Sequence, residues 1–464
     1  MYRKAIIPTE MQLLHFKFRK AMVRAAACAV MLFGALVPTG AHAQLGLPQV
    51  QPPSLPGNAP LGIDPARPFG LPQRIIEPAA DAVYLRLRKN QDLLRRYPDR
   101  IEADPKGQPV VRGELVAYSP SPALLDKARE EGFVVVRQQA VPGLDESFVV
   151  LRPPNGVSTR DGLRRLRELA PDDALDFNHL YGESASTTSE REKPPTPSEA
   201  VRPANGATPL KVGLIDSGVD GNVEALRDVR IHREGCSGHS VPNRHGTAVA
   251  SIMVGKAERF RGAAPGADLY AADVYCDEPT GGALDAIVAA FAWMARENVA
   301  VVNVSLVGPA NRVLERIVAR MIARGHLIVA AVGNEGPAAP PLYPAAYPGV
   351  VGATAVDGAA RALPEAARGA QVAFAAPGAD MAAANIDSGY VIVRGTSFAA
   401  PIVAGLLASL CDRPDAAAAQ HAVAQLKASA ADLGERGKDP VYGDGLVGQE
   451  VRVIPSRVAA REMR

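Results

Sequence analysis

Arg394-Gly-Thr-Ser-Phe-Ala-Ala-Pro-Ile-Val-Ala-Gly405 is the most informative stretch of this chain. Gly395 and Thr396 permit a tight turn, and the run from Ser397 to Leu410 is small and apolar enough for a buried helix. We therefore expect the Ser397 hydroxyl at a helix N-terminus, where free N–H groups and the helix dipole favour negative charge. A serine in that position either caps the helix or acts as a nucleophile whose developing oxyanion meets backbone donors.

Two upstream stretches favour the nucleophile. Lys211-Val-Gly-Leu-Ile-Asp-Ser-Gly-Val219 predicts a buried strand that ends in Asp216. Asn243-Arg-His-Gly-Thr-Ala-Val-Ala-Ser-Ile-Met-Val-Gly255 predicts a helix that opens at His245. An acid, a base and a nucleophile thus each lie at the end of a regular element. Each of them alone could still be a turn aspartate, a helix-start histidine or a capping serine.

Together with Val329-Ala-Ala-Val-Gly-Asn-Glu-Gly336, these stretches resemble the subtilisin-like serine proteases, also called subtilases or peptidase family S8. The order Asp, His, Ser is the order of that family, and it differs from the orders of chymotrypsin and the α/β-hydrolases. The resemblance covers residues 209–455. It implies a serine endopeptidase that hydrolyses protein or peptide substrates through an acyl-enzyme on Ser397 and requires no cofactor for catalysis.

The resemblance also assigns a role to each residue. Ser397 would attack the peptide carbonyl, His245 would accept its proton, and Asp216 would orient the imidazole. The amide of Asn334 and the backbone N–H of Ser397 would form the oxyanion hole. Two alternatives remain open. One is a subtilase fold that has lost activity and serves as a binding protein, and the other is the acid-acting sedolisin branch, which has Glu where this chain has His245.

A substrate-binding segment is indicated by Asn303-Val-Ser-Leu-Val-Gly-Pro309, which resembles the family segment that pairs with the substrate backbone. Glycine is usual in the family at the position of Val307. We expect this β-branched side chain to narrow the pocket for the residue before the scissile bond and to disfavour Phe, Tyr and Trp, unless it turns away. The candidate contact residues are Ser305, Leu306, Val307 and Gly308, with Glu335 at the opposite rim.

From Leu210 onward, Val-, Ile- and Ala-rich runs alternate with helical patterns. This alternation predicts an α/β fold in which a parallel sheet is covered by helices on both faces. Functional side chains gather beyond the carboxyl ends of the strands in such sheets. The expected strands are residues 212–216, 269–274, 299–304, 327–332 and 350–353, and the expected helices are residues 246–254, 283–298, 311–324 and 397–410.

A smaller α+β unit precedes this domain at residues 78–182. After a helix over residues 78–96, its elements follow the β-α-β-β-α-β order of the ferredoxin-like arrangement, with Ser121 and Ser158 as helix caps. Placed before a subtilase domain, this unit resembles the propeptide of the family, which assists folding and inhibits the enzyme. A retained interaction domain is the alternative. Residues 183–208 predict an exposed, cleavable linker, and residues 456–464 a short tail.

Residues 1–43 contain a basic region, an apolar run and the sequence Ala41-His-Ala43, which together predict a signal peptide. A buried N-terminal helix is the alternative. The Pro- and Gly-rich residues 44–77 are typical of a disordered spacer. We therefore expect export to a periplasm or to the medium, no membrane anchor after removal of the signal, and a monomer.

Charge and cysteine content narrow the partners. The 464 residues carry a net charge of +2, which gives no reason to expect nucleic acid as a partner. Export implies an oxidising compartment, in which Cys236 and Cys276 are the candidate disulfide and Cys411 is a buried free thiol. Whether calcium binds is left open. We predict no zinc site, because no zinc pattern has the spacing of the four neighbouring residues His232, Cys236, His239 and His245.

Overall fold

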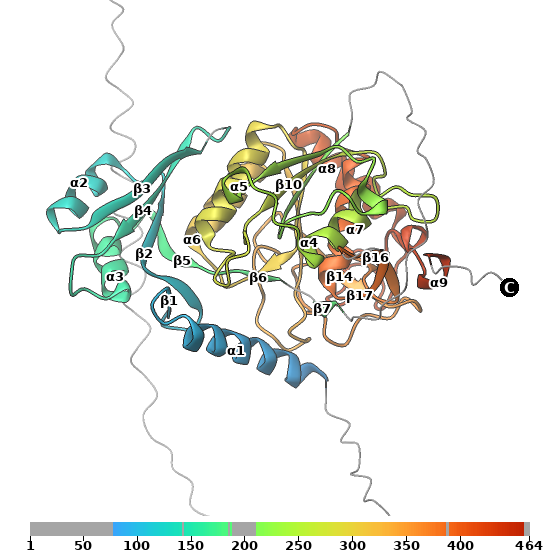
Figure 1. Ribbon diagram of the computed structural model, residues 1–464, viewed down its shortest axis with the longest axis horizontal. Coiled ribbons are helices and arrows are strands. Elements are labelled where there is room, and N and C mark those ends of the chain that lie inside the picture. The colour runs from blue at the N-terminus through green and yellow to red at the C-terminus, as the bar shows by residue number, and fades with distance from the viewer. Residues whose placement is uncertain (1–77, 142, 184–185, 188–209, 387–388, 459–464) are drawn as a thin grey trace, which may run out of the picture. The chain divides into compact units, whose positions relative to one another are not determined.

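The computed structural model describes residues 78–141, 143–183, 186–187, 210–386 and 389–458 (Figure 1). The predicted signal peptide at residues 1–43, the spacer at residues 44–77 and residues 188–208 of the predicted linker lie outside this part of the chain. Within the described part, no helix combines the length and the apolar character that crossing a lipid bilayer requires.

A parallel sheet of seven strands forms the centre of the larger domain. From one edge to the other, its strands are β15 (Val372–Pro377), β14 (Val351–Val356), β13 (Leu327–Ala331), β11 (Val301–Val304), β8 (Lys211–Asp216), β10 (Asp268–Asp273) and β9 (Ile231–Glu234). The predicted α/β fold is thereby confirmed, and the five expected strands are all in the sheet. The two edge strands were not expected, because β9 is mostly polar and β15 is rich in alanine, which is depleted in strands.

Helices cover both faces of this sheet (Figure 1). On one face, α4 (Arg244–Val254) and α7 (Thr396–Ala408) share an apolar cluster with the strands, and α8 (Ala416–Ser429) packs on α7. On the other face lie α5 (Leu284–Arg296) and α6 (Arg312–Ala323). α7 is apolar nearly all round, as expected of a helix buried on every side.

A small antiparallel sheet leads the chain into α7. In it, β16 (Met381–Ala384) pairs with β17 (Tyr390–Arg394), and β17 pairs with β7 (Ser186–Thr187) from the N-terminal side of the chain. The short helix α9 (Pro455–Val458) packs on β16 and β17 and buries Val458. The folded chain thus includes residues 456–458, which we expected in the tail.

An antiparallel sheet forms the centre of the smaller domain. In order, its strands are β5 (Ala174–His179), β2 (Pro109–Tyr118), β4 (Glu146–Arg152) and β3 (Val134–Val141), while β1 (Ile101–Ala103) pairs with the start of β2. α2 (Pro122–Glu130) and α3 (Thr159–Leu169) cover one face, and Ser121 and Ser158 cap them as expected. The elements therefore have the ferredoxin-like order.

The second face of this sheet packs on α5 and α6 of the larger domain (Figure 1). Val116, Phe148 and Val150 belong to the apolar cluster that these two helices form. Asp176 accepts a hydrogen bond of 2.8 Å from the backbone N–H of Arg312, the first residue of α6. A carboxylate in this position compensates the unpaired N–H groups and the dipole of a helix N-terminus. Apolar packing and polar contacts at a helix start thus both join the domains.

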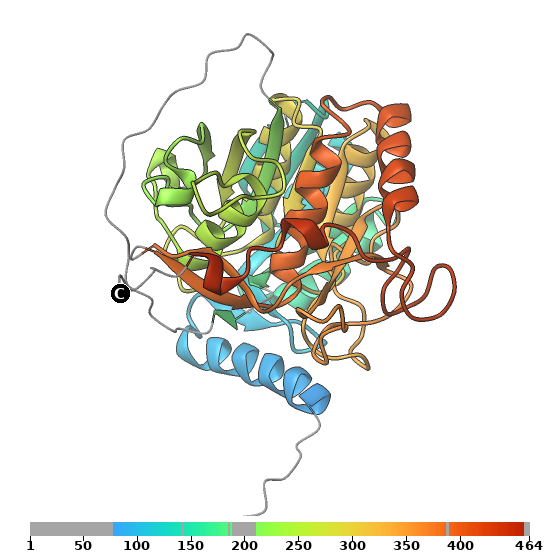
Figure 2. The same ribbon diagram turned by 90° about the vertical axis from the view of Figure 1, so that its right-hand side faces the viewer.

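The helix α1 (Pro78–Arg96) has the bounds that its sequence predicts. It contacts β1 and β2, and in Figure 1 it lies apart from the layer of α2 and α3. Figure 2 shows the full length of the same helix in blue. The Asn90 amide donates to the Gln108 side chain at 3.4 Å and ties α1 to the turn before β2. α1 is therefore attached to the smaller domain without covering its sheet.

Candidate active site

Asp216 and His245 are hydrogen-bonded to each other at the carboxyl end of β8. His245 Nδ1 lies 2.8 Å from Asp216 Oδ1, and both side chains are buried. Because a carboxylate can only accept, Nδ1 carries the proton, and Nε2 is the basic nitrogen of the neutral ring. The same Oδ1 also accepts from the backbone N–H and the hydroxyl of Ser217, at 2.6 and 3.0 Å. These contacts fix the orientation of both side chains.

The start of α4 places the His245 ring. Asn243 caps this helix, and its Oδ1 accepts from the backbone N–H of His245 at 2.9 Å. A Cβ atom at Gly246 would lie 2.1 Å from the carbonyl oxygen of Ser217. Helix α4 can therefore approach the turn after β8 this closely only with glycine at position 246.

The environment of His245 favours its charged form. Burial alone would lower the pKa of His245, because it removes water from the imidazolium. The Asp216 carboxylate acts in the opposite direction through its charge and its hydrogen bond, and the pKa is raised above its ordinary value. Glu183 adds to this rise and Lys89 opposes it. One oxygen of Glu183, one of Asp216 and a ring nitrogen of His245 lie within 4.8 Å of one another.

Ser397 is the second residue of α7 and is fully buried. Pro401, one turn further on, has no N–H to donate to the Ser397 carbonyl. Ser305 Oγ donates to this carbonyl instead, at 3.1 Å, and Asn303 Nδ2 donates to Ser305 Oγ at 2.8 Å. The predicted substrate-binding residue Ser305 thus holds the first turn of the helix that carries Ser397.

The helices that carry His245 and Ser397 pack against each other. The centroids of the His245 and Phe398 rings are 5.5 Å apart. His245 Nε2 and Ser397 Oγ are both buried, and neither has a hydrogen-bond partner within the described residues. A base and a nucleophile commonly stay apart until substrate is engaged and come into hydrogen-bond contact in the reacting complex.

Asn334 lies in the turn after β13, next to the start of α7. Its Oδ1 accepts from the backbone N–H of Thr396 at 3.0 Å, and Thr396 Oγ1 accepts from the backbone N–H of Gly333 at 3.2 Å. These two bonds join the turn to the helix and fix the plane of the Asn334 amide, whose Nδ2 is a hydrogen-bond donor. An amide donor beside a serine at a helix N-terminus is the composition of an oxyanion hole.

A cleft of about 970 Å³ lies beside Asn334 and Gly395, and part of the chain itself runs along it. Residues 180–183 line the cleft, and we call them, together with residues 186–187 further along the chain, the cleft segment. Its strand β6 (Gly182–Glu183) pairs antiparallel with β12 (Leu306–Val307), and its strand β7 pairs with β17, which leads directly into α7. Backbone pairing with an exposed strand edge is a common way to bind an extended peptide.

Comparison with known proteins identifies the family. The family model described as "Subtilase family" matches residues 208–445. The chain belongs to the subtilase family. Subtilisin DY from Bacillus licheniformis is 31% identical over 249 residues, which are 52% of this chain and 89% of that protein. Members of this family are serine-type endopeptidases.

Two further relatives define how far the likeness extends. Minor extracellular protease Epr from Bacillus subtilis (strain 168) is 30% identical over 264 residues, which are 54% of this chain and 40% of Epr, so the match spans less than half of Epr. Among solved structures, fervidolysin from Fervidobacterium pennivorans, described as a keratinolytic enzyme related to subtilisin, has a TM-score of 0.57 at 19% identity. That match covers 74% of this chain and 61% of the fervidolysin chain, and it concerns the fold alone.

In this subtilase, Tyr181 of the cleft segment is a buried residue with an exposed fraction of 1%. Its hydroxyl donates to the Pro309 carbonyl at 3.0 Å. Its ring lies against Gly308, where a Cβ atom would be 2.1 Å from Tyr181 Cδ1. The predicted contact residue Gly308 therefore leaves the space that an aromatic side chain fills.

Two residues of the loop between β10 and α5 also hold the cleft segment. Tyr275 Oη donates to the Tyr181 carbonyl at 3.2 Å, and the Gly282 carbonyl accepts from the Tyr181 N–H at 2.8 Å. Neither residue was predicted from the sequence. Neither carries a local signal, because each contacts a segment about a hundred positions earlier in the chain.

Val307 and Glu335 border the cleft, as we expected. Val307 is buried beneath the cleft segment, so its effect on the width of the pocket stays a prediction. The Glu335 carboxylate accepts a hydrogen bond of 2.9 Å from the guanidinium of Arg86, on α1. A basic side chain thus already lies at the rim where Glu335 was expected.

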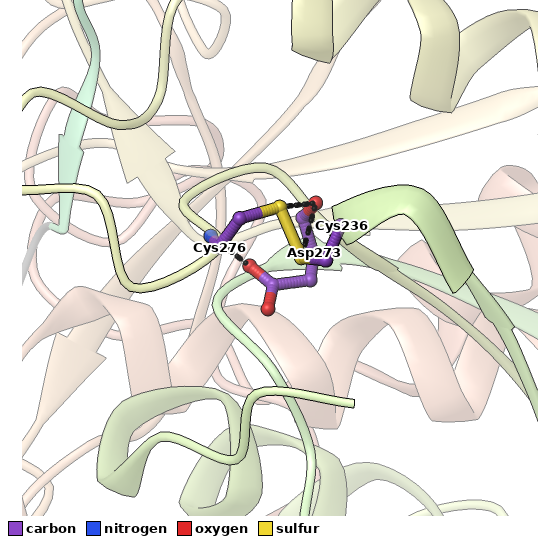
Figure 3. Close-up of side chains that lie close together, drawn as sticks. All are labelled: Cys236, Asp273 and Cys276. Atoms are coloured by element: carbon purple, nitrogen blue, oxygen red, sulfur yellow. Dashed lines mark hydrogen bonds between the residues drawn. A yellow bond between two sulfur atoms is a disulfide. The ribbon is translucent and has the colours of Figure 1, made fainter. Parts of the chain in front are cut away.

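Cys236 and Cys276 form a disulfide, with their Cα atoms 5.1 Å apart (Figure 3). Asp273 lies beside it, and its Oδ1 accepts from the backbone N–H groups of Tyr275 and Cys276 at 2.9 and 3.0 Å. Burial raises the pKa of Asp273. The disulfide and these bonds together hold the start of the loop that presents Tyr275 to the cleft segment.

Three of the four neighbouring residues His232, Cys236, His239 and His245 make separate side-chain contacts. The His232 ring stacks on Tyr270 with centroids 4.4 Å apart, Cys236 is in the disulfide, and His245 is bonded to Asp216. Cys411, the remaining cysteine of the described chain, is a buried free thiol at the end of the apolar helix region.

Proposed function

We propose that this subtilase is an exported serine endopeptidase made as a self-inhibited precursor. Its triad is Asp216, His245 and Ser397, and Asn334 and the Ser397 N–H bind the oxyanion. The cleft segment carries the proposal: this stretch of the chain pairs first with β12 and then with β17, the strand that leads into the helix of Ser397. A substrate of an endopeptidase must extend along the enzyme on both sides of the bond that is cut, because that bond lies inside a chain.

The first half of the reaction forms the acyl-enzyme. Ser397 Oγ attacks the peptide carbonyl carbon while its proton passes to His245 Nε2. Asp216 stabilises the resulting imidazolium through the hydrogen bond to Nδ1. The tetrahedral oxyanion accepts hydrogen bonds from the Ser397 N–H and from Asn334 Nδ2. His245 then gives the proton to the departing amine, which leaves an ester on Ser397.

The second half releases the product. Water attacks the ester while His245 Nε2 takes its proton, and the same nitrogen returns a proton to Ser397 Oγ as the carboxylic acid departs. Side chains and backbone groups supply all of these steps, so the proposed chemistry requires no cofactor. The substrates are proteins or peptides that bind in extended form.

The contacts between the two domains support the proposed self-inhibition. After a first cut between Glu183 and Ser186, the new carboxyl end would remain paired with β12 because the N-terminal domain holds it there. Arg137 pairs with Asp285 at 2.6 Å, and Asn311 Nδ2 donates to the Phe177 carbonyl at 3.0 Å, in addition to the apolar packing. The N-terminal domain would thus act as a propeptide, and the predicted signal peptide and the disulfide support export.

Expression of the full chain in a host without other proteases tests the proposal. Ser397→Ala should accumulate as a precursor that has lost its signal peptide and nothing more. Wild type and Ser409→Ala, which changes an exposed serine at the end of α7, should release a fragment that begins between Ser184 and Ser186 in mass spectra. A fluorophosphonate probe should label the mature wild type. Normal maturation of Ser397→Ala, or a mature wild type that the probe does not label, would favour the non-catalytic binding protein instead.

A further inference from the structure

Helix α1 is not needed to complete the ferredoxin-like domain, whose sheet is covered by α2 and α3 on one face and by α5 and α6 on the other. Four of its side chains, Arg86, Lys89, Asn90 and Leu93, instead line the cleft of the larger domain. The same cleft is also lined by Val307, Asn334 and Gly395, residues at and beside the proposed catalytic groups. α1 therefore lies over the space in which substrate side chains would be bound.

The contact that holds α1 there is an ion pair of low exposure. Arg86 Nη1 lies 2.9 Å from Glu335 Oε1, and the two side chains are 20% and 13% exposed. The second oxygen, Glu335 Oε2, is buried and has no hydrogen-bond partner within the described residues. Removal of the guanidinium would leave a largely buried carboxylate without its counter-charge, which is a costly arrangement.

A second ion pair extends the same rim but is weaker. Arg100, just after α1, pairs with Glu278 at 2.6 Å, and both side chains are more than half exposed. Exposed pairs of this kind contribute little, because water and salt screen them. The two pairs nevertheless have the same polarity, with the base on the N-terminal part and the acid on the rim of the cleft.

We propose that this acidic rim is a docking surface for a basic segment, and that α1 is its occupant in the precursor and a second inhibitory element besides the cleft segment. The proposal rests on the proposed peptidase function. The cleft segment blocks the path of the substrate backbone, whereas α1 covers the side-chain pocket next to Asn334. Arg86 is the anchor, because it reaches the carboxylate that directly follows the oxyanion donor in the chain.

The test uses the self-cleaved, non-covalent complex purified from the full chain. After dilution, a fluorophosphonate probe reports how fast Ser397 becomes accessible, and each rate is divided by the labelling rate of the mature form of the same variant. Arg86→Ala should expose Ser397 about threefold to tenfold faster than wild type, the effect expected of one partly buried ion pair. Alanine is the best helix former, so the helix itself is not weakened by this change.

Arg95→Ala is the matched control, since Arg95 is on the same helix, is exposed and pairs with Asp92 of that helix. It should behave as wild type. The charge exchange Arg86→Glu with Glu335→Arg should return the rate toward wild type, although each single substitution increases it. Equal rates for Arg86→Ala and Arg95→Ala, or an exchange no slower than its single variants, would overturn the proposal. If the probe labels no form of any variant, including mature wild type, then the proposed peptidase function has failed instead.

Discussion

The cleft segment and helix α1 both meet the active-site cleft, and they do so in opposite ways. The cleft segment is held through its backbone, by strand pairing with β12 and β17 and by the bonds from Tyr181 to Gly282 and Tyr275, and also through the buried ring of Tyr181. α1 is held through side chains, above all by the charge pair between Arg86 and Glu335. Backbone pairing accepts many sequences, as a substrate site must, whereas a charge pair depends on two particular residues.

The two contacts should also differ in strength. The cleft segment buries a complete aromatic side chain and adds backbone hydrogen bonds, and burial of apolar area is the larger source of affinity. α1 adds one ion pair that still has some access to water. We therefore expect changes to the catalytic groups and to the cleft segment to have large effects, and changes to α1 to modulate them.

The largest effect, on the rate of self-cleavage, should come from Asp216→Asn. This substitution tests whether the cleft segment is a substrate and not only a bound strand. Asparagine keeps the size of the side chain but removes the charge that orients and stabilises the imidazolium. Self-cleavage of the full chain should slow by about 10⁴-fold, a loss of the size known for this change in a Ser-His-Asp triad. Appearance of the shortened chain on gels over days measures it.

Asp172→Asn, at an exposed position of the N-terminal domain, is the control and should cleave as wild type. If Asp216→Asn cleaves itself within about tenfold of the wild-type rate, then the triad does not cut the cleft segment, and the difference between a substrate-like strand and an inhibitory helix disappears.

A smaller effect, on kcat/KM for peptide substrates, should come from changes to Tyr181, the side chain that the cleft segment buries. Peptides with the sequence of residues 180–187 can carry Tyr, Phe or Ala at the position of Tyr181. Compared with Tyr, we expect kcat/KM of the mature enzyme to be about threefold to tenfold lower with Phe, which cannot donate to the Pro309 carbonyl. With Ala it should be about 100-fold lower, because the buried ring is lost.

Two variants separate side-chain from backbone recognition in that experiment. Gly308→Ala should abolish the preference for Tyr, since the added Cβ takes the place of the ring. Tyr275→Phe should lower kcat/KM for all three peptides by the same factor, because its hydroxyl contacts a backbone carbonyl. Equal kcat/KM for the three peptides with wild-type enzyme would show that the segment is bound through its backbone alone.

The candidate catalytic residues and the bounds of several helices could be predicted from local sequence signals. Strand ends, helix starts and glycine turns identified Asp216, His245 and Ser397 as candidates, and the cap residues Ser121 and Ser158 marked the helices of the N-terminal domain. The bounds of α1 followed from its apolar spacing in the same way. All of these features are determined within a few residues of the chain, so the sequence contains them.

The features that depend on contacts between distant segments of the chain could not be predicted from the sequence. Ser305 was predicted as a substrate contact, which stays a prediction, and the sequence did not show that its hydroxyl replaces the hydrogen bond that Pro401 cannot make. Tyr275 and Gly282 have no pattern of their own and become binding residues only because β6 pairs with β12. The place of α1 over the cleft likewise depends on how two domains pack, and helical periodicity carries no information about that.

The smallest effect we expect concerns pH, and it contrasts the two regions most directly. Burial lowers the pKa of His245 and Asp216 raises it, and the two regions then act in opposite directions: Glu183 of the cleft segment raises the pKa and Lys89 of α1 lowers it. His245 must be neutral to take the proton of Ser397, so self-cleavage should become faster as pH rises through this pKa, which lies above the ordinary value of about 6.5.

Glu183→Gln removes a negative charge near the imidazole, so the pKa of His245 should fall and the acid limb of self-cleavage should move to lower pH. Lys89→Met removes a positive charge, so the pKa should rise and the limb should move to higher pH. Precursor purified at acid pH, where the imidazolium prevents cleavage, can be brought rapidly to each pH between 5 and 9 and its cleavage followed. Lys127→Met, on α2, should leave the limb in place. If the acid limb moved in the same direction for Glu183→Gln and Lys89→Met, the cleft segment and α1 would not act on the imidazole with opposite charges. The electrostatic contrast between the two regions would then be wrong.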